Sequence, residues 1–433
     1  MELKSQIEQH SARIAVIGQG YVGLPLAIAF AQVGFEVTGI DIDADRVEAL
    51  NRAVSHIGDV EGETLRGLMT TGRYRATTAM ERLADSDAII ICVPTPLRKS
   101  KDPDISFVLA AASEVKKYLR PGHLVILEST TYPGTTEELL LLMFTERDLT
   151  VGKDFFLAFS PERIDPGNPR FRVRDIPKIV GGVTPMCSYL AALLYTQIVN
   201  KVMSVSSPTV AELAKLYENT FRSVNIALAN EFALMCSHLG VNVWEVIDAA
   251  ATKPFGFMPF FPGPGIGGHC IPIDPMYLAW KLRLNGYEAR FIALADEVNR
   301  SMPGHVVSLL VDGLNARGKC LKGAQILVLG VTYKRGVSDL RESPALDVIT
   351  LLRSKGAVVR YADPFVPFLA HEGLCVERVD LEVEVVRQSD AVLILTDHQE
   401  FDYQMVVKTA DLVVDTRNAL RNLSVPQERI IRL

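Results

Sequence analysis

The side chain best suited to covalent chemistry lies in a glycine-rich loop, GPGIGGHCIPID, from Gly263 to Asp274. Its four glycines let another backbone or a ligand approach closely, and its prolines stiffen it. Cys270 stands in this loop with Asp274 four positions later, so a thiol lies near a carboxylate. A thiol in such surroundings is a candidate covalent nucleophile. The alternative is a small cysteine packed in a core, which does not need so many glycines around it.

A long helix is predicted over residues 208–239, with Ser207 able to cap it and Gly240 ending it. Its apolar residues recur three or four positions apart, which predicts one buried stripe. At about 1.5 Å per residue it is longer than a small domain needs, so we expect it to bridge two domains and to lie in a subunit interface. The stripe consists of residues 210, 213, 217, 221, 224, 228, 232 and 235.

Three polar residues share another face of this helix, because Lys215, Asn219 and Arg222 stand at i, i+4 and i+7. An ammonium and an amide four residues apart can together hold an oxyanion or a water molecule. Lys215 and Asn219 are therefore candidate catalytic and substrate-binding residues. A solvated helix surface is the alternative, and for Arg222 both interpretations stay open.

The chain opens with a dinucleotide-binding signature. Gly18, Gly20 and Gly23 form G-x-G-x-x-G between a predicted strand and a predicted helix, and the next strand ends at Asp41. The glycines make the turn, admit a pyrophosphate and let the helix pack closely, while the helix N-terminus attracts the phosphates. Asp41 is expected to accept hydrogen bonds from ribose hydroxyls and to repel a 2′-phosphate. This pattern predicts NAD rather than NADP.

Three further residues are expected near the cofactor. Tyr21 and Val22 lie inside the glycine motif itself. Arg46 either lies over the adenine or is a solvated helix charge, and the two interpretations stay open.

Polar side chains follow three more predicted strands. Thr95 follows one, Thr130 and Thr131 follow the next, and Glu162 with Arg163 follows a third. Ligands of doubly wound sheets bind at the carboxyl ends of the strands, so these residues are candidates for contact with a cofactor or a reacting group. Turn-stabilising hydroxyls and an exposed loop carboxylate are the alternatives.

A second strand–helix alternation begins near residue 324, in which Gly330-Val-Thr-Tyr-Lys334 replaces the glycine signature. We therefore predict a second, smaller parallel sheet without a second NAD site. Lys334 and Arg417 lie at its strand ends and are suited to phosphates, although most such charges are surface residues. A preceding helix over residues 290–311 is predicted to be interrupted at Pro303.

The predicted fold is α/β, with two Rossmann-like doubly wound domains joined by a long central helix and a helical middle domain. The predicted domains are residues 1–200, 201–312 and 313–433. The remaining predicted helices cover residues 21–32, 277–285 and 343–355. The predicted strands are residues 13–17, 36–40, 88–93, 124–127, 155–159, 325–329, 358–361, 391–395 and 412–414.

Composition excludes several classes of protein. Lys+Arg 45 against Asp+Glu 51 gives a net charge of −6, which argues against bulk nucleic-acid binding. No apolar stretch is long enough to cross a membrane, and the first residues do not form a signal peptide. The six cysteines form no CxxC pair, which predicts free thiols in a reducing cytoplasm and no metal site.

Seven stretches together resemble one enzyme family: IGQGYVGLPLA, CVPTP, ESTTYPGTT, SPER, AELAKLYENT, GPGIGGHCIPIDP and YKRGVSDLRESP. Over essentially its whole length the chain is similar to the nucleotide-sugar 6-dehydrogenases, the group that contains UDP-glucose and GDP-mannose dehydrogenases. Three stretches resemble most the bacterial UDP-N-acetylglucosamine 6-dehydrogenases of surface polysaccharide (capsule and O-antigen) biosynthesis. These are SPERIDPGNP, DAAATKPFGF and GGHCIPIDP.

The resemblance implies that the sugar C6 alcohol is oxidised twice, to a carboxylate, with two NAD and through a thiohemiacetal and a thioester on Cys270. Lys215 and Asn219 match residues that stabilise the oxyanion and hold water. The resemblance also implies a UDP-sugar as partner and a homodimer or higher homo-oligomer. The family's water-positioning and acid/base residues are matched by Thr131, Glu162 and Asp274. Its cofactor contacts are matched by Thr130 and Arg341, and its UDP-sugar contacts by Lys334 and Arg417. The residues expected to border the substrate are Arg163, Arg222, Gly265 and Gly267.

The chain departs from the glucose-type pattern in the cysteine loop. His269 replaces the serine that precedes the cysteine in UDP-glucose dehydrogenases, and Ile273 replaces a lysine. Arg163, Ile164 and Asp165 differ as well. Because members acting on acetamido sugars share both loop changes, the resemblance favours UDP-N-acetylglucosamine, with UDP-N-acetylmannosamine and UDP-glucose as alternatives.

Two other functions compete with this interpretation. A single-step dehydrogenase of the 6-phosphogluconate or hydroxy-acid type also pairs an NAD fold with a helix carrying Lys and Asn. It needs neither Cys270 nor residues 320–433. A non-catalytic NAD-binding sensor would require that Cys270, Lys215 and Asp274 occur together by chance, so the constellation favours an enzyme.

Overall fold

The computed structural model describes residues 2–58, 60–98, 101–164, 173–371, 373–424 and 427–433. Residues 165–169, which end the stretch SPERIDPGNP, lie outside them. The chain divides into two compact units. The first comprises Met1–Glu218 and Met276–Gly286, and the second comprises Asn219–Pro275 and Tyr287–Leu433.

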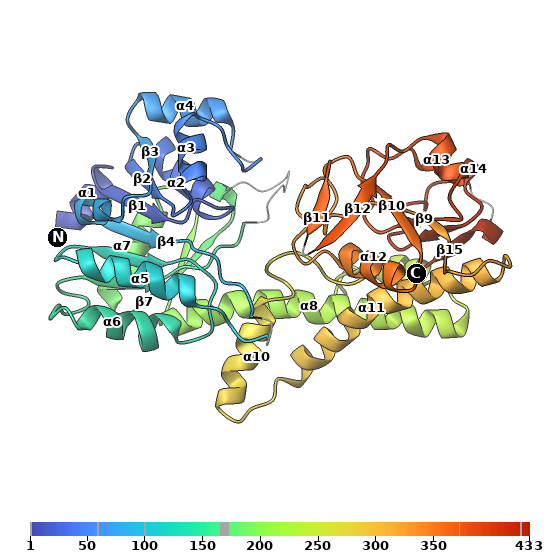
Figure 1. Ribbon diagram of the computed structural model, residues 1–433. Coiled ribbons are helices and arrows are strands. Elements are labelled where there is room, and N and C mark those ends of the chain that lie inside the picture. The colour runs from blue at the N-terminus through green and yellow to red at the C-terminus, as the bar shows by residue number, and fades with distance from the viewer. Residues whose placement is uncertain (1, 59, 99–100, 165–172, 372, 425–426) are drawn as a thin grey trace. The chain divides into compact units, whose positions relative to one another are not determined.

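The described residues of the first unit form a sheet with the strand order β3-β2-β1-β4-β5-β6-β7-β8 (Figure 1). All neighbouring strands are parallel except β6 and β7. The central strands are short apolar runs, as expected for parallel strands covered on both faces. The strands are β1 (Arg13–Ile17), β2 (Glu36–Ile40), β3 (Tyr74–Thr77), β4 (Ala88–Ile91), β5 (Leu124–Leu127), β6 (Phe156–Phe159), β7 (Lys178–Gly182) and β8 (Val202–Val205).

Two apolar clusters cover the two faces of this sheet, which makes the fold doubly wound. One face is packed by α1 (Glu2–Glu8), α2 (Gly23–Gln32), α3 (Ala44–Asn51), α4 (Gly62–Thr70) and α7 (Pro185–Tyr195). The other is packed by η1 (Met80–Asp85), α5 (Ser106–Tyr118), the π-helix η2 (Thr136–Leu141) and α6 (Leu142–Thr145). A short 3₁₀ helix, η3 (Val173–Asp175), precedes β7.

The second unit contains a sheet with the order β11-β12-β10-β9-β13-β14-β15. Its strands are parallel except for the β11–β12 pair. One face packs on the helices α9, α11 and α12 and on α8 residues, and the other packs on α13 and α14. The strands are β9 (Gln325–Leu329), β10 (Val358–Ala362), β11 (Leu369–His371), β12 (Leu374–Arg378), β13 (Ala391–Ile394), β14 (Val413–Asp415) and β15 (Ile430–Arg432). The helices are α9 (Val243–Ala251), α11 (Arg290–Asn315), α12 (Pro344–Ser354), α13 (Val383–Arg387), α14 (Tyr403–Thr409) and η4 (Gln427–Arg429).

Two helices contribute residues to both units. In α8 (Pro208–Leu239) the residues up to Glu218 belong to the first unit and the rest to the second. In α10 (Asp274–Leu284) the first two residues belong to the second unit. The cap predicted for α8 is confirmed, because the Ser207 hydroxyl accepts a hydrogen bond from the Val210 backbone N–H at 3.2 Å.

The apolar stripe of α8 is largely exposed in this chain, with Tyr217 73% and Leu228 55% exposed, so its expected place in a subunit interface stays a prediction. Two other expectations about these elements are wrong. Helix α11 continues through Pro303, where buried neighbours such as Met302 and Val306 offset one lost backbone hydrogen bond. The second sheet is not wholly parallel, because the short strands β11 and β12 pair antiparallel.

Candidate active site

The carboxyl ends of four neighbouring strands in the first unit bring the predicted cofactor residues to one edge of the sheet. Gly18 follows β1, Thr95 follows β4, Thr130 and Thr131 follow β5, and Glu162 follows β6. The Ser129 hydroxyl donates to the Val93 carbonyl at 2.8 Å and so ties the loops after β5 and β4 together. This edge is where a doubly wound sheet binds its ligand.

The glycine motif fits a dinucleotide. Gly18 has φ +90°, and a Cβ built on it would lie 2.3 Å from the Cys92 carbonyl oxygen. A Cβ on Gly23 would lie 1.8 Å from the Gly18 oxygen, so α2 packs directly on the turn. A Cβ on Gly20 would meet nothing within 4 Å, which leaves open space for a pyrophosphate beside the backbone. Tyr21 and Val22, next in the motif, stay predicted cofactor contacts.

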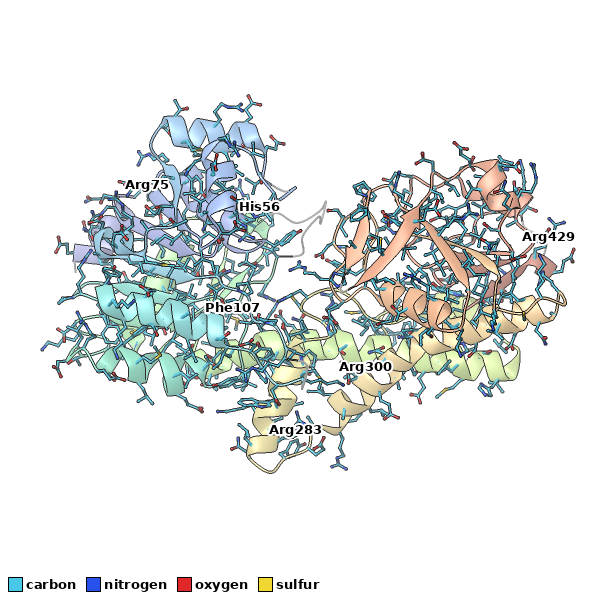
Figure 2. The ribbon with its side chains drawn as sticks, in the orientation of Figure 1. His56, Arg75, Phe107, Arg283, Arg300 and Arg429 are labelled. Atoms are coloured by element: carbon cyan, nitrogen blue, oxygen red, sulfur yellow. The ribbon has the colours of Figure 1, made fainter. Side chains whose placement is uncertain are left out.

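Asp41 is held at the end of β2 by backbone donors. Its carboxylate accepts from the Gln19 N–H at 2.8 Å and from the Asp43 N–H at 3.0 Å. Arg46 forms an ion pair with Asp41 at 3.0 Å and with Asp43 at 3.2 Å, a pairing that neither interpretation of Arg46 anticipated. His56, labelled in Figure 2, lies beside this group, and burial followed by the Arg46 charge lowers its pKa.

Both carboxylate oxygens of Glu162 accept hydrogen bonds. Its Oε1 accepts from the backbone N–H groups of Arg163 at 2.6 Å and Ile164 at 2.5 Å, and its Oε2 lies 2.8 Å from Lys178 Nζ. Burial alone would raise the pKa of Glu162. Lys178 and the hydrogen bonds outweigh burial and lower the pKa to about 2. Glu162 therefore accepts hydrogen bonds at neutral pH, and the alternative of an exposed loop carboxylate is wrong.

Lys178 also binds a second carboxylate behind Glu162. It forms an ion pair with Glu128, which accepts a hydrogen bond from the Tyr195 hydroxyl. All four side chains are buried or nearly so. Burial raises the pKa of Glu128 to about 8, because two carboxylates share one ammonium and Glu162 has the backbone donors. Sequence reasoning missed Glu128, Lys178 and Tyr195, since only the sheet brings them together.

Two other predicted residues at this edge differ in their surroundings. Thr131 is 1% exposed, and its hydroxyl has no hydrogen-bond partner among the described residues, so it is available to a water or a ligand. Arg163 instead forms an ion pair with Glu218 of α8 at 2.7 Å and donates to the Pro177 carbonyl at 2.7 Å. Its predicted contact with the substrate stays a prediction.

The polar face of α8 is partly buried. Lys215 is 9% and Asn219 4% exposed, whereas Arg222 is exposed. The Asn219 amide donates to Asp274 Oδ2 at 2.6 Å, so two residues 55 positions apart meet within the second unit. An amide held by a carboxylate presents its oxygen in a fixed direction, as a water-binding group needs.

Cys270 is exposed four residues before α10 begins. Its carbonyl oxygen accepts from the Ile273 N–H at 3.2 Å and from the Asp274 N–H at 2.8 Å, so the turn that leads into α10 fixes its backbone. Burial, followed by the nearby Arg341 charge, lowers the pKa of His269. His269 thus brings a neutral imidazole next to the thiol at neutral pH.

The glycines of the cysteine loop allow close packing against the second sheet's loops. A Cβ on Gly263 would lie 2.5 Å from Arg417 Nη1, and one on Gly267 would lie 2.6 Å from Tyr333 Cβ. Gly265 has φ +137°, and its Cβ would lie 3.0 Å from Pro344 Cβ. The loop that carries the thiol is therefore packed closely, and at Gly265 and Gly267, which face backbone and inner side-chain atoms, a larger residue would force a shift.

Two buried asparagines, which sequence reasoning also missed, anchor the start of this loop. The Gly263 N–H donates to Asn230 Oδ1 at 2.9 Å, and the Asn230 amide donates to Asn299 Oδ1 at 2.8 Å. Asn299 in turn donates to the Ser223 carbonyl at 3.3 Å. Both lie in predicted helices, but nothing in either stretch indicates its partner 69 positions away.

Arg417 follows β14 and presents a cation without a carboxylate partner among the described residues. Its Nε donates to the Leu395 carbonyl at 3.0 Å. Burial, followed by the charge of Arg335, lowers its pKa to about 10, still far above neutral pH. Such a guanidinium suits the oxygens of a diphosphate. Arg341 pairs with Asp339 at 2.7 Å, and its contact with the cofactor stays a prediction.

No group of three or more potential metal ligands occurs among the described residues. Within the same residues, no helix is both long enough and apolar enough to span a membrane.

Comparison with known proteins finds matches along nearly the whole chain. The models of the UDP-glucose/GDP-mannose dehydrogenase family match residues 12–199 (NAD binding domain), 209–301 (central domain) and 327–422 (UDP binding domain). A UDP-N-acetyl-D-mannosamine dehydrogenase of Pyrococcus horikoshii is 39% identical over 415 residues, covering 94% of this chain and 96% of that protein.

Two further comparisons agree with this match. An NDP-N-acetyl-D-galactosaminuronic acid dehydrogenase of Ralstonia solanacearum is 36% identical over 404 residues, with coverage of 91% and 93%. The solved structure of the UDP-D-ManNAc dehydrogenase from Pyrococcus horikoshii has a TM-score of 0.88 at 36% identity and covers 97% of this chain and 98% of that one.

Proposed function

Because the chain belongs to the UDP-glucose/GDP-mannose dehydrogenase family, we propose that it oxidises the C6 alcohol of UDP-N-acetylglucosamine to a carboxylate. The chain is an NAD-dependent nucleotide-sugar dehydrogenase with a UDP-binding domain. The exposed thiol of Cys270 carries the proposal, since its loop packs on Arg417 and Tyr333 of that domain. The division into domains of residues 1–200, 201–312 and 313–433 is part of the same proposal.

The glycine motif and Asp41 would hold NAD, which when bound would supply the hydride acceptor for each of the two oxidations. An alcohol offers a thiolate no electrophilic carbon, so Cys270 enters after the first oxidation. Its sulfur adds to the C6 aldehyde and forms a thiohemiacetal, whose oxidation leaves a thioester. Water then hydrolyses the thioester, which releases the carboxylate and returns the thiol.

Other residues of the chain support these steps in the proposal. The Lys215 ammonium stabilises the oxyanion that forms at C6. In the second unit Asn219, held by Asp274, is a water-positioning residue, and in the first unit the Thr131 hydroxyl, which has no hydrogen-bond partner among the described residues, is another. Glu162 accepts a hydrogen bond at its site and does not release a proton at neutral pH, because its pKa is lowered to about 2.

The sugar is the finer part of the proposal. The relatives named above act, by their names, on N-acetylated manno or galacto sugars, which supports an acetamido sugar. The stretches KPFGFMPFF and GGHCIPIDP favour the gluco epimer by their resemblance to that group. UDP-N-acetylmannosamine is the second candidate, because a relative and a solved structure with that name match 94% and 97% of the chain.

We expect purified protein with NAD to oxidise UDP-N-acetylglucosamine with a higher kcat/KM than UDP-N-acetylmannosamine or UDP-glucose. Two NADH should form for each sugar consumed. The measurement is NADH absorbance against acid product for the three sugars in parallel. A yield of one NADH per sugar would indicate the single-step class, and a higher kcat/KM for the manno or glucose substrate would contradict the assigned sugar.

We also propose that the chain forms a homodimer in which the exposed apolar stripe of α8 is covered by a second copy. Tyr217, Leu228 and Met235 of the stripe are 73%, 55% and 46% exposed, and contiguous apolar patches on soluble proteins mark association sites. Light scattering after size-exclusion chromatography should give the mass of two chains. Leu228→Lys should shift it toward one chain, and a wild-type mass of one chain would contradict the proposal.

A further inference from the structure

The second unit repeats the hydrogen bonds that hold the ribose-binding aspartate of the first unit. In the first unit, Gly18 has φ +90° and the following residue donates its N–H to Asp41 at 2.8 Å. In the second unit, Gly330 has φ +79° and the following residue, Val331, donates its N–H to Asp363 at 2.8 Å. Asp363 directly follows β10, which lies beside β9, as Asp41 directly follows β2, which lies beside β1.

A buried histidine distinguishes the second of these sites. His398 Nε2 lies 3.1 Å from Asp363 Oδ2, and both side chains are 0% exposed. The imidazole lies against the rings of Phe365, at 5.0 Å between centroids, and Phe401, at 5.6 Å. Asp363 therefore accepts a hydrogen bond from a side chain of its own unit. The aspartate of a dinucleotide-binding unit accepts one from a ribose instead.

The same imidazole holds the loop that carries Lys334. The Gly336 N–H donates to His398 Nδ1 at 3.2 Å, so Nδ1 is the acceptor and Nε2 carries the hydrogen. That hydrogen points to Asp363 and to the Thr332 hydroxyl oxygen, 3.1 Å from Nε2. Thr332 donates its own hydrogen to the Lys334 carbonyl at 2.8 Å. One ring thus fixes the loop on both sides of Lys334.

The aspartate stabilises this arrangement. Burial alone would raise the pKa of Asp363, but the hydrogen bonds from His398, Val331 and Phe365 outweigh burial and lower it. Asp363 is therefore an anion that orients the imidazole in one tautomer. An oriented imidazole keeps both loop contacts at once, as a neutral ring with one donor and one acceptor must.

We propose that His398 is a positioning residue for UDP binding. It pairs with Asp363, where a dinucleotide-binding unit would pair its aspartate with a ribose, and it fixes the 331–336 loop so that Lys334 meets the diphosphate. The inference rests on the proposed UDP-sugar substrate, since it assigns Lys334 to that ligand. The ligand that Lys334 would contact is a uridine diphosphate group, and UDP itself is the probe for it. The site belongs entirely to the second unit.

The test is titration of the full chain with UDP by calorimetry. His398→Phe keeps an aromatic ring but removes both loop contacts, and it should weaken UDP binding about tenfold or more, as expected for lost buried hydrogen bonds. His398→Gln, whose amide reaches the Nε2 position, keeps the Asp363 contact and should lose only about threefold. The KM for NAD should stay unchanged in both variants.

Tyr361→Phe is the matched control, because it removes a buried hydrogen bond to the Val366 carbonyl in the same sheet without touching the loop. It should bind UDP like the wild type even if its melting temperature falls. In a Lys334→Met background, His398→Phe should weaken UDP binding by less than about twofold, because its effect passes through Lys334.

The outcomes separate the two proposals. Wild-type protein that does not bind UDP would contradict the proposed substrate class, and the inference with it. Wild-type protein that binds UDP, together with a folded His398→Phe or His398→Gln variant of unchanged affinity, would overturn the inference alone. An equal loss in the presence and absence of Lys334 would make His398 a general stabiliser of the sheet and would overturn it as well.

Discussion

Replacing Cys270 by alanine should abolish acid formation while UDP and NAD binding persist. Without a thiol the aldehyde has no route to a thioester, so at most one NADH should form per sugar. We expect the rate of carboxylate formation to fall by roughly 10³-fold or more, as when a covalent nucleophile is removed from other enzymes. The measurement is acid product and NADH per sugar, with UDP affinity determined in parallel.

Two further variants make this test specific. Cys270→Ser keeps a nucleophile of similar size and should stall at a sugar ester that mass spectrometry detects on the protein. Cys320 is a matched control, because it is also an exposed thiol and donates to the Lys322 carbonyl at 3.4 Å. Cys320→Ala should retain normal turnover. Near-normal acid formation by Cys270→Ala would remove the thioester from the mechanism.

Replacing Lys178 by methionine should be the most destabilising single change at the sheet edge. It leaves Glu128 and Glu162 buried together without a counter-charge, which costs about 3–5 kcal/mol when one partner of a buried pair is removed. Acid formation should fall too, because Glu162 loses the donor that fixes its Oε2. The measurement is the midpoint of urea unfolding, with activity measured on the folded fraction.

The loss of folding stability in Lys178→Met should depend on pH, and the pKa shifts of the two carboxyls fix its direction. A folded pKa of about 8 for Glu128 lies above its ordinary value of 4.5, so its stabilising contribution is present below 4.5 and is lost as pH rises through about 8. Glu162, lowered to about 2, contributes stability above 4.5 that is lost as pH falls toward 2. Without Lys178 both carboxyls resist ionisation, so the deficit of Lys178→Met should be larger at pH 8 than at pH 5.

A second substitution that should restore stability, and a control at an exposed ion pair, make this test specific. Adding Glu128→Gln to Lys178→Met removes one of the two buried charges and should recover a large part of the lost stability. Lys281→Met breaks the ion pair with Glu138, which is 57% exposed, and should cost less than about 1 kcal/mol. A pH-independent deficit, or no recovery in the double variant, would show that the buried charges do not govern this site.

Much of the fold could be predicted because the strands are apolar and their ends are marked. The segments 13–17, 36–40, 124–127 and 325–329 and the helix over residues 208–239 coincide with the structure. Glycines and prolines at the ends of the elements indicated these boundaries. The edge strands β11 and β15 were missed because each has three residues and is partly exposed, and the neighbouring β12 was missed because most of its residues are exposed, so none of the three has an apolar run.

The candidate site was predicted where a motif names a chemistry and missed where only folding joins residues. Cys270, Asp41 and the glycine turn are recognisable from local spacing. Lys178 on β7 and Glu128 after β5 are 50 positions apart, and nothing in either stretch indicates the other. The pairing of Asn219 with Asp274 and the buried asparagine chain to Gly263 depend on packing in the same way.

The cysteine loop and the glycine turn of the first unit can change by separate sets of mutations. Asp41 and Arg46 lie in the first unit, whereas the cysteine loop, Tyr333 and Arg417 lie in the second. A Cβ at position 267 would lie 2.6 Å from Tyr333 Cβ and 2.8 Å from the Glu342 carbonyl oxygen, so a larger residue there would require the backbone to shift, whereas the atom nearest a Cβ at position 263 is the flexible end of Arg417. Across diverging lineages, residue 267 should therefore stay glycine more strictly than residue 263, while the positions of the first unit vary independently of both.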